Sequence, residues 1–462
     1  MLETRQSALE YAHNHHDTFL NDLENFLKIA SISTSPEHKS EMITAANAAA
    51  SMLRQIGFDR VQVMSTPGHP IVYGEWMKAG LDMPTVLVYG HYDVQPVDPI
   101  DLWNSDPFSP QVQGDLLVAR GASDMKGQIV AVISAIRAIL QQGPLPVNVK
   151  FILEGEEEIG SPNLKSFLEE NRELLTSTIA LNPDAGMIGP DSPTIVTTLR
   201  GLAYFELRIY GPDHDLHSGL FGGIVHNPAQ VLCELIAGMH DPMGRVTLPN
   251  YYKRVRTLSP EERAESARLP MNDEYFQAQA GVQKLWGEQG FTAAERIGAR
   301  PTLEVNGLYS GFTGSGSKTV LPAYAMAKIS MRLVADQDPD EVQQQLVQYL
   351  TERAPDTVRW EIIPMAGSFA SAANPNSREA IAFANALESV WGVRPLYKRE
   401  GGSVPVVTDM QKILGIDSVL TGFGLPDDRI HSPNEHLHLP TWYKGIDSII
   451  HFLYNLAANH KE

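Results

Sequence analysis

The chain has 462 residues, of which 43% are hydrophobic and 20% charged, as in a globular protein large enough for two domains. Its net charge of -19 repels phosphate backbones and anionic lipid, so we expect no nucleic-acid or membrane partner. Cys233 is the one cysteine, which excludes an intrachain disulfide and favours a reducing compartment. Because neither a signal peptide nor a membrane-spanning stretch is evident, we predict a cytoplasmic protein.

The first part of the chain alternates between helical and strand patterns. Apolar residues recur at helical spacing over 8–30 and again over 127–141. Short β-branched, apolar segments, typical of buried strands, occupy 84–89, 147–153 and 177–181. Strands that alternate with helices predict an α/β sheet with helices on its faces.

The pattern changes near Arg200, where a second series of elements begins. Strands are expected at 202–210, 302–308, 325–334 and 358–363. Helices are expected at 227–239 and from Asp338-Pro339 onward, and a polar helical insertion at about 241–300. The order β-α-β-β-α-β is that of a ferredoxin-like domain.

From about residue 373 the chain returns to α/β character. Helices are expected at 378–390 and 442–457, and a strand at 418–422. We therefore predict a mixed sheet flanked by helices, built from 1–199 and 373–462, with a ferredoxin-like α+β domain of residues 200–372 inserted in it.

Five groups rich in His, Asp and Glu each follow an apolar segment. They are His91-Tyr-Asp93, Asp124-Met-Lys-Gly127, Glu156-Glu157-Glu158, Asn182-Pro-Asp184 and His431-Ser-Pro-Asn-Glu435. Ligands gather at the carboxyl ends of strands in open α/β sheets, so we expect these groups to lie together. Imidazole and carboxylate ligands without Cys suit two divalent cations. Two adjacent cations activate water and polarise a carbonyl group, so the pattern predicts a hydrolase.

Each group taken alone has a more ordinary explanation. An Asp that precedes a helix, as Asp124 does, is more often a cap, and a run of three Glu is more often a solvated surface. Their joint occurrence at strand ends favours a site, because helix caps have no reason to cluster there.

Longer motifs sharpen this hypothesis. They read Gly-His-Tyr-Asp-Val-Gln-Pro96, Arg-Gly-Ala-Ser-Asp-Met-Lys-Gly127, Glu-Gly-Glu-Glu-Glu-Ile-Gly-Ser161, Asp-Leu-His-Ser-Gly219, Ser-Gly-Ser-Lys-Thr-Val-Leu-Pro322 and Glu-Gly-Gly-Ser-Val-Pro405. In this order they resemble the co-catalytic di-zinc family of aminopeptidases, carboxypeptidases and aminoacylases, in particular its cytosolic carnosinase-like dipeptidases. The resemblance implies hydrolysis of dipeptides or of short peptides with a free C-terminus. An N-acyl-amino-acid hydrolase or a glutamate-type carboxypeptidase is the alternative, because the attacked bond is always an amide.

The resemblance implies a metal ligand at each of five positions. His91 and Asp184 hold one cation, Glu158 and His431 hold the other, and Asp124 bridges them. The implied cofactors are two zinc ions per chain, with manganese or cobalt as alternatives.

Two further residues have implied roles beside the cations. Glu157 is the general base, although Glu156 competes with it when the sequence alone is considered. Asp93 orients His91 by accepting a hydrogen bond from its ring.

The inserted domain of the family is a lid that carries substrate contacts and the dimer interface, so we expect a homodimer. His217 resembles the His that enters the partner's active site and stabilises the oxyanion, and Arg332 resembles the Arg that meets the substrate carboxylate. Thr319, Gly402 and Ser403 resemble further substrate contacts. A guanidinium group suits a carboxylate because it binds both oxygens.

One departure from the pattern concerns the substrate. Carnosinase-like members often carry a further substrate-binding His after the last strand of the lid, but here no His occurs between His240 and His431. The sequence therefore leaves specificity for carnosine itself in doubt.

Two other classes of protein agree less well with the sequence. Residues 311–319 resemble the phosphate-binding loop of a nucleotide-binding protein, but Ser317 separates the last Gly from Lys318, and Pro322 follows where a helix is required. A binding protein without activity is disfavoured because a suitable residue occupies every position of the implied metal ligands and base. Metal content would discriminate such a protein from the enzyme.

Overall fold

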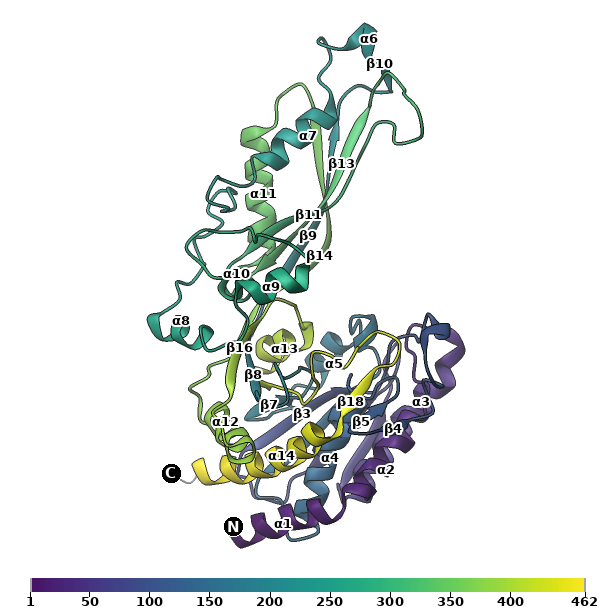
Figure 1. Ribbon diagram of the computed structural model, residues 1–462, viewed down its shortest axis with the longest axis vertical. Coiled ribbons are helices and arrows are strands. Elements are labelled where there is room, and N and C mark those ends of the chain that lie inside the picture. Colours follow the sequence, from purple (N-terminus) through teal and green to yellow (C-terminus); the bar gives the residue numbers. More distant parts are fainter. Residues whose placement is uncertain (1, 461–462) are drawn as a thin grey trace. The chain divides into compact units, whose positions relative to one another are not determined.

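The computed structural model describes residues 2–460, which divide into two compact units (Figure 1). Unit 1 comprises Met1–Thr197, Ala373–Tyr397 and Asp409–Glu462, and unit 2 comprises Thr198–Ala372 and Lys398–Thr408. The sequence-based division had assigned 398–408 to the first domain. This segment lies with unit 2 because the Arg200 amide and Nε each donate a hydrogen bond to it, at 3.1 Å.

The core of unit 1 is a mixed sheet. Its strands include β1 (Arg60–Met64), β2 (Ile71–Trp76), β3 (Thr85–His91), β6 (Asn148–Glu154), β7 (Ile179–Asn182), β8 (Thr194–Leu199) and β17 (Ser418–Leu420). These lie in the order β1-β2-β6-β3-β7-β17-β8, and the short strands β15 (Ser371–Ala372) and β16 (Leu396–Glu400) also pair with β8. Strands β6, β3, β7 and β17 are parallel, so their carboxyl ends meet at one edge.

Helices cover this sheet. They are α1 (Leu2–Asn14), α2 (His16–Leu27), α3 (Lys39–Gln55), α4 (Lys126–Leu140), α5 (Leu164–Glu170), α12 (Arg378–Trp391) and α14 (Leu439–Asn459). The apolar face predicted for α4 is buried, and this helix packs against β3, α1, α2 and α14. The predicted mixed α/β fold is thereby confirmed.

The single helix predicted over 8–30 is wrong, since α1 and α2 are separate helices. His15 has φ -124° and ψ 20°, outside the helical region. Its ring Nδ1 lies 2.8 Å from the Tyr11 carbonyl oxygen, and its amide instead donates to the Ala12 carbonyl at 3.1 Å. The side chain thus occupies the acceptor that a continuous helix would use.

Unit 2 contains a four-stranded antiparallel sheet. Its elements are β9 (Gly201–Tyr210), α7 (Pro228–Ala237), β11 (Thr302–Ser310), β13 (Tyr324–Leu333), α11 (Pro339–Arg353) and β14 (Arg359–Ser368). The order β11-β13-β9-β14 is that of a ferredoxin-like sheet. Buried and half-buried residues alternate along β9, because its apolar face packs against α7 and α11.

Shorter elements complete the chain. They are η1 (Pro36–His38), η2 (Ile100–Leu102), β4 (Gln111–Gln113), β5 (Leu116–Val118), η3 (Glu157–Ile159), β10 (Leu216–His217), α6 (Ser218–Phe221), α8 (Pro260–Ser266), α9 (Asp273–Ala280), α10 (Ala293–Ala299), β12 (Val320–Leu321), β15 (Ser371–Ala372), β16 (Leu396–Glu400), α13 (Pro405–Asp409), η4 (Met410–Leu414) and β18 (His436–His438). Within residues 2–460, no helix combines the length and apolarity that crossing a membrane requires.

Candidate metal centre

The five predicted metal ligands come together in unit 1. They form two groups of three that share one residue: His91, Asp124 and Asp184, and Asp124, Glu158 and His431. Within each group the candidate ligand atoms all lie within 4.8 Å of one another. The parallel strands β3, β6 and β7 end at this edge, so the residues at or just after their carboxyl ends converge.

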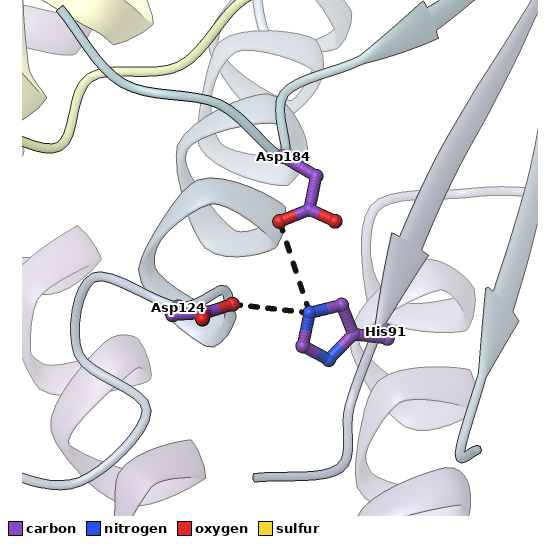
Figure 2. Close-up of side chains that lie close together, drawn as sticks. All are labelled: His91, Asp124 and Asp184. Carbon is purple, nitrogen blue, oxygen red and sulfur yellow. Dashed lines mark hydrogen bonds and ion pairs between the residues drawn. The ribbon is translucent and has the colours of Figure 1, made fainter. Parts of the chain in front are cut away.

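In the first group, the carboxylates of Asp124 and Asp184 both face one ring nitrogen of His91 (Figure 2). His91 is fully buried at the end of β3, and its Nε2 lies 3.1 Å from Asp124 Oδ1 and 3.8 Å from Asp184 Oδ1. Burial lowers the pKa of His91, but hydrogen bonds to Asp124, Asp184 and Asp93 outweigh it and raise the pKa well above its usual value. One ring nitrogen that faces two carboxylates is a donor set suited to a shared cation.

The second group contains the other oxygen of the shared carboxylate. His431 Nε2 lies 3.0 Å from Asp124 Oδ2 and 3.3 Å from Glu158 Oε2. His431 has φ 58°, a left-handed backbone conformation that few residues other than Gly adopt, and this turn aims its ring at the carboxylates. The two oxygens of Asp124 therefore face two different histidines, as a carboxylate that bridges two cations requires.

The pKa values of this second group follow from the close contacts. Hydrogen bonds from His431 and His91 lower the pKa of Asp124, although burial opposes this shift. Hydrogen bonds to Asp124 and Glu158 raise the pKa of His431 to about 10. The cluster thus concentrates three carboxylates around two imidazole rings, and divalent cations would balance this charge.

Asp93 does more than orient His91. Its carbonyl oxygen lies 3.1 Å from His91 Nδ1, and its carboxylate Oδ1 lies 3.4 Å from the same atom. The carboxylate also accepts hydrogen bonds from the amides of Glu157 and Glu158, at 3.3 and 3.1 Å. One buried residue therefore contacts both His91 on β3 and the short helix η3.

The geometry distinguishes the two glutamates that competed for the role of base. Glu156 Oε1 accepts from the His69 amide at 3.1 Å, and Oε2 accepts from Asn163 Nδ2 at 2.7 Å. No hydrogen bond or ion pair to the Glu157 carboxylate is found among residues 2–460. Burial raises the pKa of Glu157 to about 8.

Three supporting residues were missed by the sequence analysis. Gln95 Nε2 donates to Glu158 Oε2 at 2.7 Å. Arg120 and Glu435 form a buried ion pair at 2.6 Å between positions 315 residues apart. Glu435 stands in the same motif as His431, but local spacing does not reveal a partner so distant in the chain.

One cluster of the predicted substrate residues lies in unit 2 at the Arg332 end of β13. Arg332 NH1 donates to Ser403 Oγ at 3.1 Å, and Ser403 Oγ donates to the Arg200 carbonyl at 2.5 Å. The Arg200 amide donates to the Gly402 carbonyl at 3.1 Å. In the described part of the chain no carboxylate forms an ion pair with Arg332.

The other cluster contains His217 of β10 and Thr319, which directly precedes β12. Figure 1 shows β10 beyond the opposite end of β13. Strands β10 and β12 pair with His217 opposite Val320, and the Ser218 amide donates to the Thr319 carbonyl at 3.0 Å. At about 3.4 Å per residue, β13 spans roughly 27 Å between Tyr324 and Arg332. The structure therefore separates the predicted substrate residues into two clusters instead of bringing all of them together.

An α/β unit with clustered His, Asp and Glu at its sheet edge, joined to a ferredoxin-like unit, defines a metallopeptidase fold. Residues 87–455 match peptidase family M20/M25/M40, and the chain belongs to that family.

Relatives and solved structures resemble the chain over nearly its whole length. It is 30% identical to the Cys-Gly metallodipeptidase dug1 of Schizosaccharomyces pombe over 96% of both chains. It is 29% identical to the human Beta-Ala-His dipeptidase, over 98% of this chain and 93% of that protein. The crystal structure of the M20 family metallo-carboxypeptidase Sso-CP2 from Sulfolobus solfataricus superposes with a TM-score of 0.81 and 34% identity, over 95% of this chain and 99% of that one.

Proposed function

We propose that this protein is a metal-dependent dipeptidase that hydrolyses dipeptides, or short peptides with a free C-terminus. The observation that carries the proposal is the Asp124 carboxylate, whose two oxygens face His91 and His431 at 3.1 and 3.0 Å. The similarity to two proteins named as dipeptidases supports the choice of substrate class.

The residues fit two divalent cations. His91 and Asp184 would hold one, Glu158 and His431 the other, and Asp124 both. The nitrogen and oxygen donors favour zinc, with manganese or cobalt as alternatives. When bound, two such cations acidify water and withdraw electron density from the carbonyl of the bond to be cleaved.

Glu157 is the proposed general base. Its carboxylate takes a proton from the attacking water and delivers a proton to the leaving amine. The Glu157 carboxylate has no hydrogen-bonding partner among residues 2–460, whereas both carboxylate oxygens of Glu156 accept hydrogen bonds. Asp93 holds the Glu157 amide and thereby fixes the position from which the base acts.

Arg332 is the proposed reader of the substrate C-terminus. Its guanidinium group has Ser403 as a neutral hydrogen-bonding partner and no ion pair among the described residues. Such a group can bind both oxygens of a free carboxylate. A need for that carboxylate would make the enzyme an exopeptidase.

His217 is proposed to act in the active site of a second copy of the chain. A dipeptide extends about 7 Å, far less than the roughly 27 Å of β13 between the two clusters. One unit 2 therefore does not present both His217 and Arg332 to one dipeptide. A symmetric homodimer resolves this, because each chain can supply His217 to its partner, where the imidazole would stabilise the oxyanion.

The test is a substrate panel on protein reconstituted with zinc or with manganese. It contains Cys-Gly, β-Ala-His and other dipeptides, their C-terminal amides, tripeptides and N-acetyl amino acids. We expect free dipeptides to be cleaved with the highest kcat/KM, and β-Ala-His to be poor because no His lies between His240 and His431.

Other outcomes would contradict the proposal. Faster turnover of N-acetyl amino acids would show an aminoacylase, and preferred release of the last residue from longer peptides would show a carboxypeptidase. The structural similarity to Sso-CP2 makes the second comparison worth measuring. The cytoplasmic location stays a prediction.

A further inference from the structure

Glu435 accepts four hydrogen bonds, all from the loop that carries Asp124. Its Oε1 accepts from the amides of Ser123 and Asp124 at 3.0 and 3.1 Å. Its Oε2 accepts from the Gly121 amide at 3.0 Å and from Arg120 NH1 at 2.6 Å. All four hydrogen-bonding partners of this carboxylate are donors, so the site is built for a group that accepts at both oxygens.

The pairing of β5 with β18 sets this position. The two strands are antiparallel, with His436 opposite Val118, and the Ala119 amide donates to the Glu435 carbonyl at 3.0 Å. The loop to Asp124 starts directly after β5, and Glu435 directly precedes β18. The pairing of β5 with β18 therefore aligns residues from the first and the last sequence segments of unit 1.

Arg120 also connects Glu435 to the segment that follows His91. The side chains of Arg120 and Glu435 are each 1% exposed. Arg120 NH2 donates to the carbonyl of Pro96, five residues after His91, at 3.0 Å. The ion pair thus joins the chain after β3, the Asp124 loop and the segment that contains His431.

We propose that Glu435 is a positioning residue, which holds the Asp124 carboxylate between the two cation positions through the amides of Gly121, Ser123 and Asp124. Asp124 must present one oxygen toward His91 and the other toward His431, and its own amide is one of those that Glu435 binds. Groups that orient metal ligands commonly change metal affinity when they are removed. This inference rests on the metal centre of the proposed function.

The test uses Glu435→Gln in the full chain. The variant keeps the shape, but its NH₂ group faces backbone N–H donors whichever way the amide turns. We expect zinc affinity, measured on metal-free protein by competition with a chelator, to fall about 10–100-fold. The absorption spectrum of the cobalt-substituted variant should also change, while the circular dichroism spectrum stays that of the wild type.

Ser123→Ala is the matched control. It removes the hydroxyl bond to Asp428 Oδ2, at 2.5 Å, on the same loop, but keeps every amide that Glu435 binds. We expect this variant to keep the zinc affinity and the cobalt spectrum of the wild type. An equal loss of affinity in Ser123→Ala and Glu435→Gln would show a general effect of loop stability and would overturn the proposal.

The remaining outcomes are also decisive. If Glu435→Gln does not fold, Glu435→Asp replaces it, since the shorter carboxylate keeps the charge but cannot reach all four donors. A folded Glu435→Gln or Glu435→Asp that binds two ions as tightly as the wild type overturns the positioning role alone. A wild-type protein that binds no divalent cation overturns both this inference and the proposed function.

Discussion

The candidate metal centre of unit 1 and the proposed substrate groups of unit 2 are built in different ways. His91 is fully buried and Asp124 is 16% exposed, and both are held by further buried partners. His217 and Thr319 are exposed, and their hydrogen bonds and strand pairing are local to β10, β12 and α6. His91 and Asp124 are thus held by buried contacts, whereas the contacts of His217 and Thr319 are local and open to solvent.

The contrast has an energetic origin. Charged groups interact more strongly where water is excluded, so each buried ligand depends on its neighbours. An exposed side chain is screened by solvent, and its loss disturbs the free protein little. We therefore expect substitutions in unit 1 to affect metal binding and chemistry, and substitutions in unit 2 to affect turnover or substrate choice without loss of metal.

The largest effect is expected for Asp124→Ala. Both groups of ligands contain Asp124, so its loss should release both cations. Activity should fall by more than the about 10²–10³-fold that removal of one oxyanion donor costs. Elemental analysis checks the metal content, and two ions retained per chain would contradict the bridging role.

The next effect is expected for Glu157→Gln. This change removes the proton acceptor and keeps the shape, so kcat should fall about 10²–10⁴-fold with metal content unchanged. Steady-state kinetics and metal analysis measure both quantities.

Glu156→Gln is the control for the base. The Glu156 carboxylate is engaged with the His69 amide and Asn163, so we expect this change to affect stability rather than the chemical step. Full activity in Glu157→Gln, together with loss of activity in Glu156→Gln, would show that Glu156 is the base.

His217→Ala tests whether the exposed cluster of unit 2 acts in a partner chain. The variant should fold and bind both metals, while kcat falls about 10²–10³-fold through loss of an oxyanion donor. Mixing it with Glu157→Gln should restore activity, because a heterodimer has one active site with both groups intact. No recovery after verified subunit exchange would contradict action in the partner's site.

The smallest effect is expected for Arg332→Ala. A hydrogen bond to a charged group contributes about 1.5–3 kcal/mol, so kcat/KM for a free dipeptide should fall roughly 10–150-fold. The same dipeptide with an amidated C-terminus should be a poor substrate for both proteins and lose little further. Equal losses of kcat/KM on the free dipeptide and on its amide would show that Arg332 has a structural role through its contact with Ser403.

Much of this architecture could be predicted from the sequence, because it follows from local periodicity. Apolar residues at helical spacing predicted α4, and alternation predicted β9 and β13, since each pattern fixes which face is buried. Parallel strands share a carboxyl edge, which is why polar groups after separate strands could be expected to meet. The motif order indicated the family to which the chain belongs.

Other features were decided by the tertiary structure alone. Three adjacent glutamates have the same local pattern, yet in the folded chain the Glu156 carboxylate contacts His69 and Asn163 and that of Glu157 does not. The Arg120–Glu435 pair depends on the ladder between β5 and β18. The periodicity of apolar residues specifies which face of a helix or strand is buried but not which segment packs against it. Contacts between segments that are distant in the sequence form only when the chain folds.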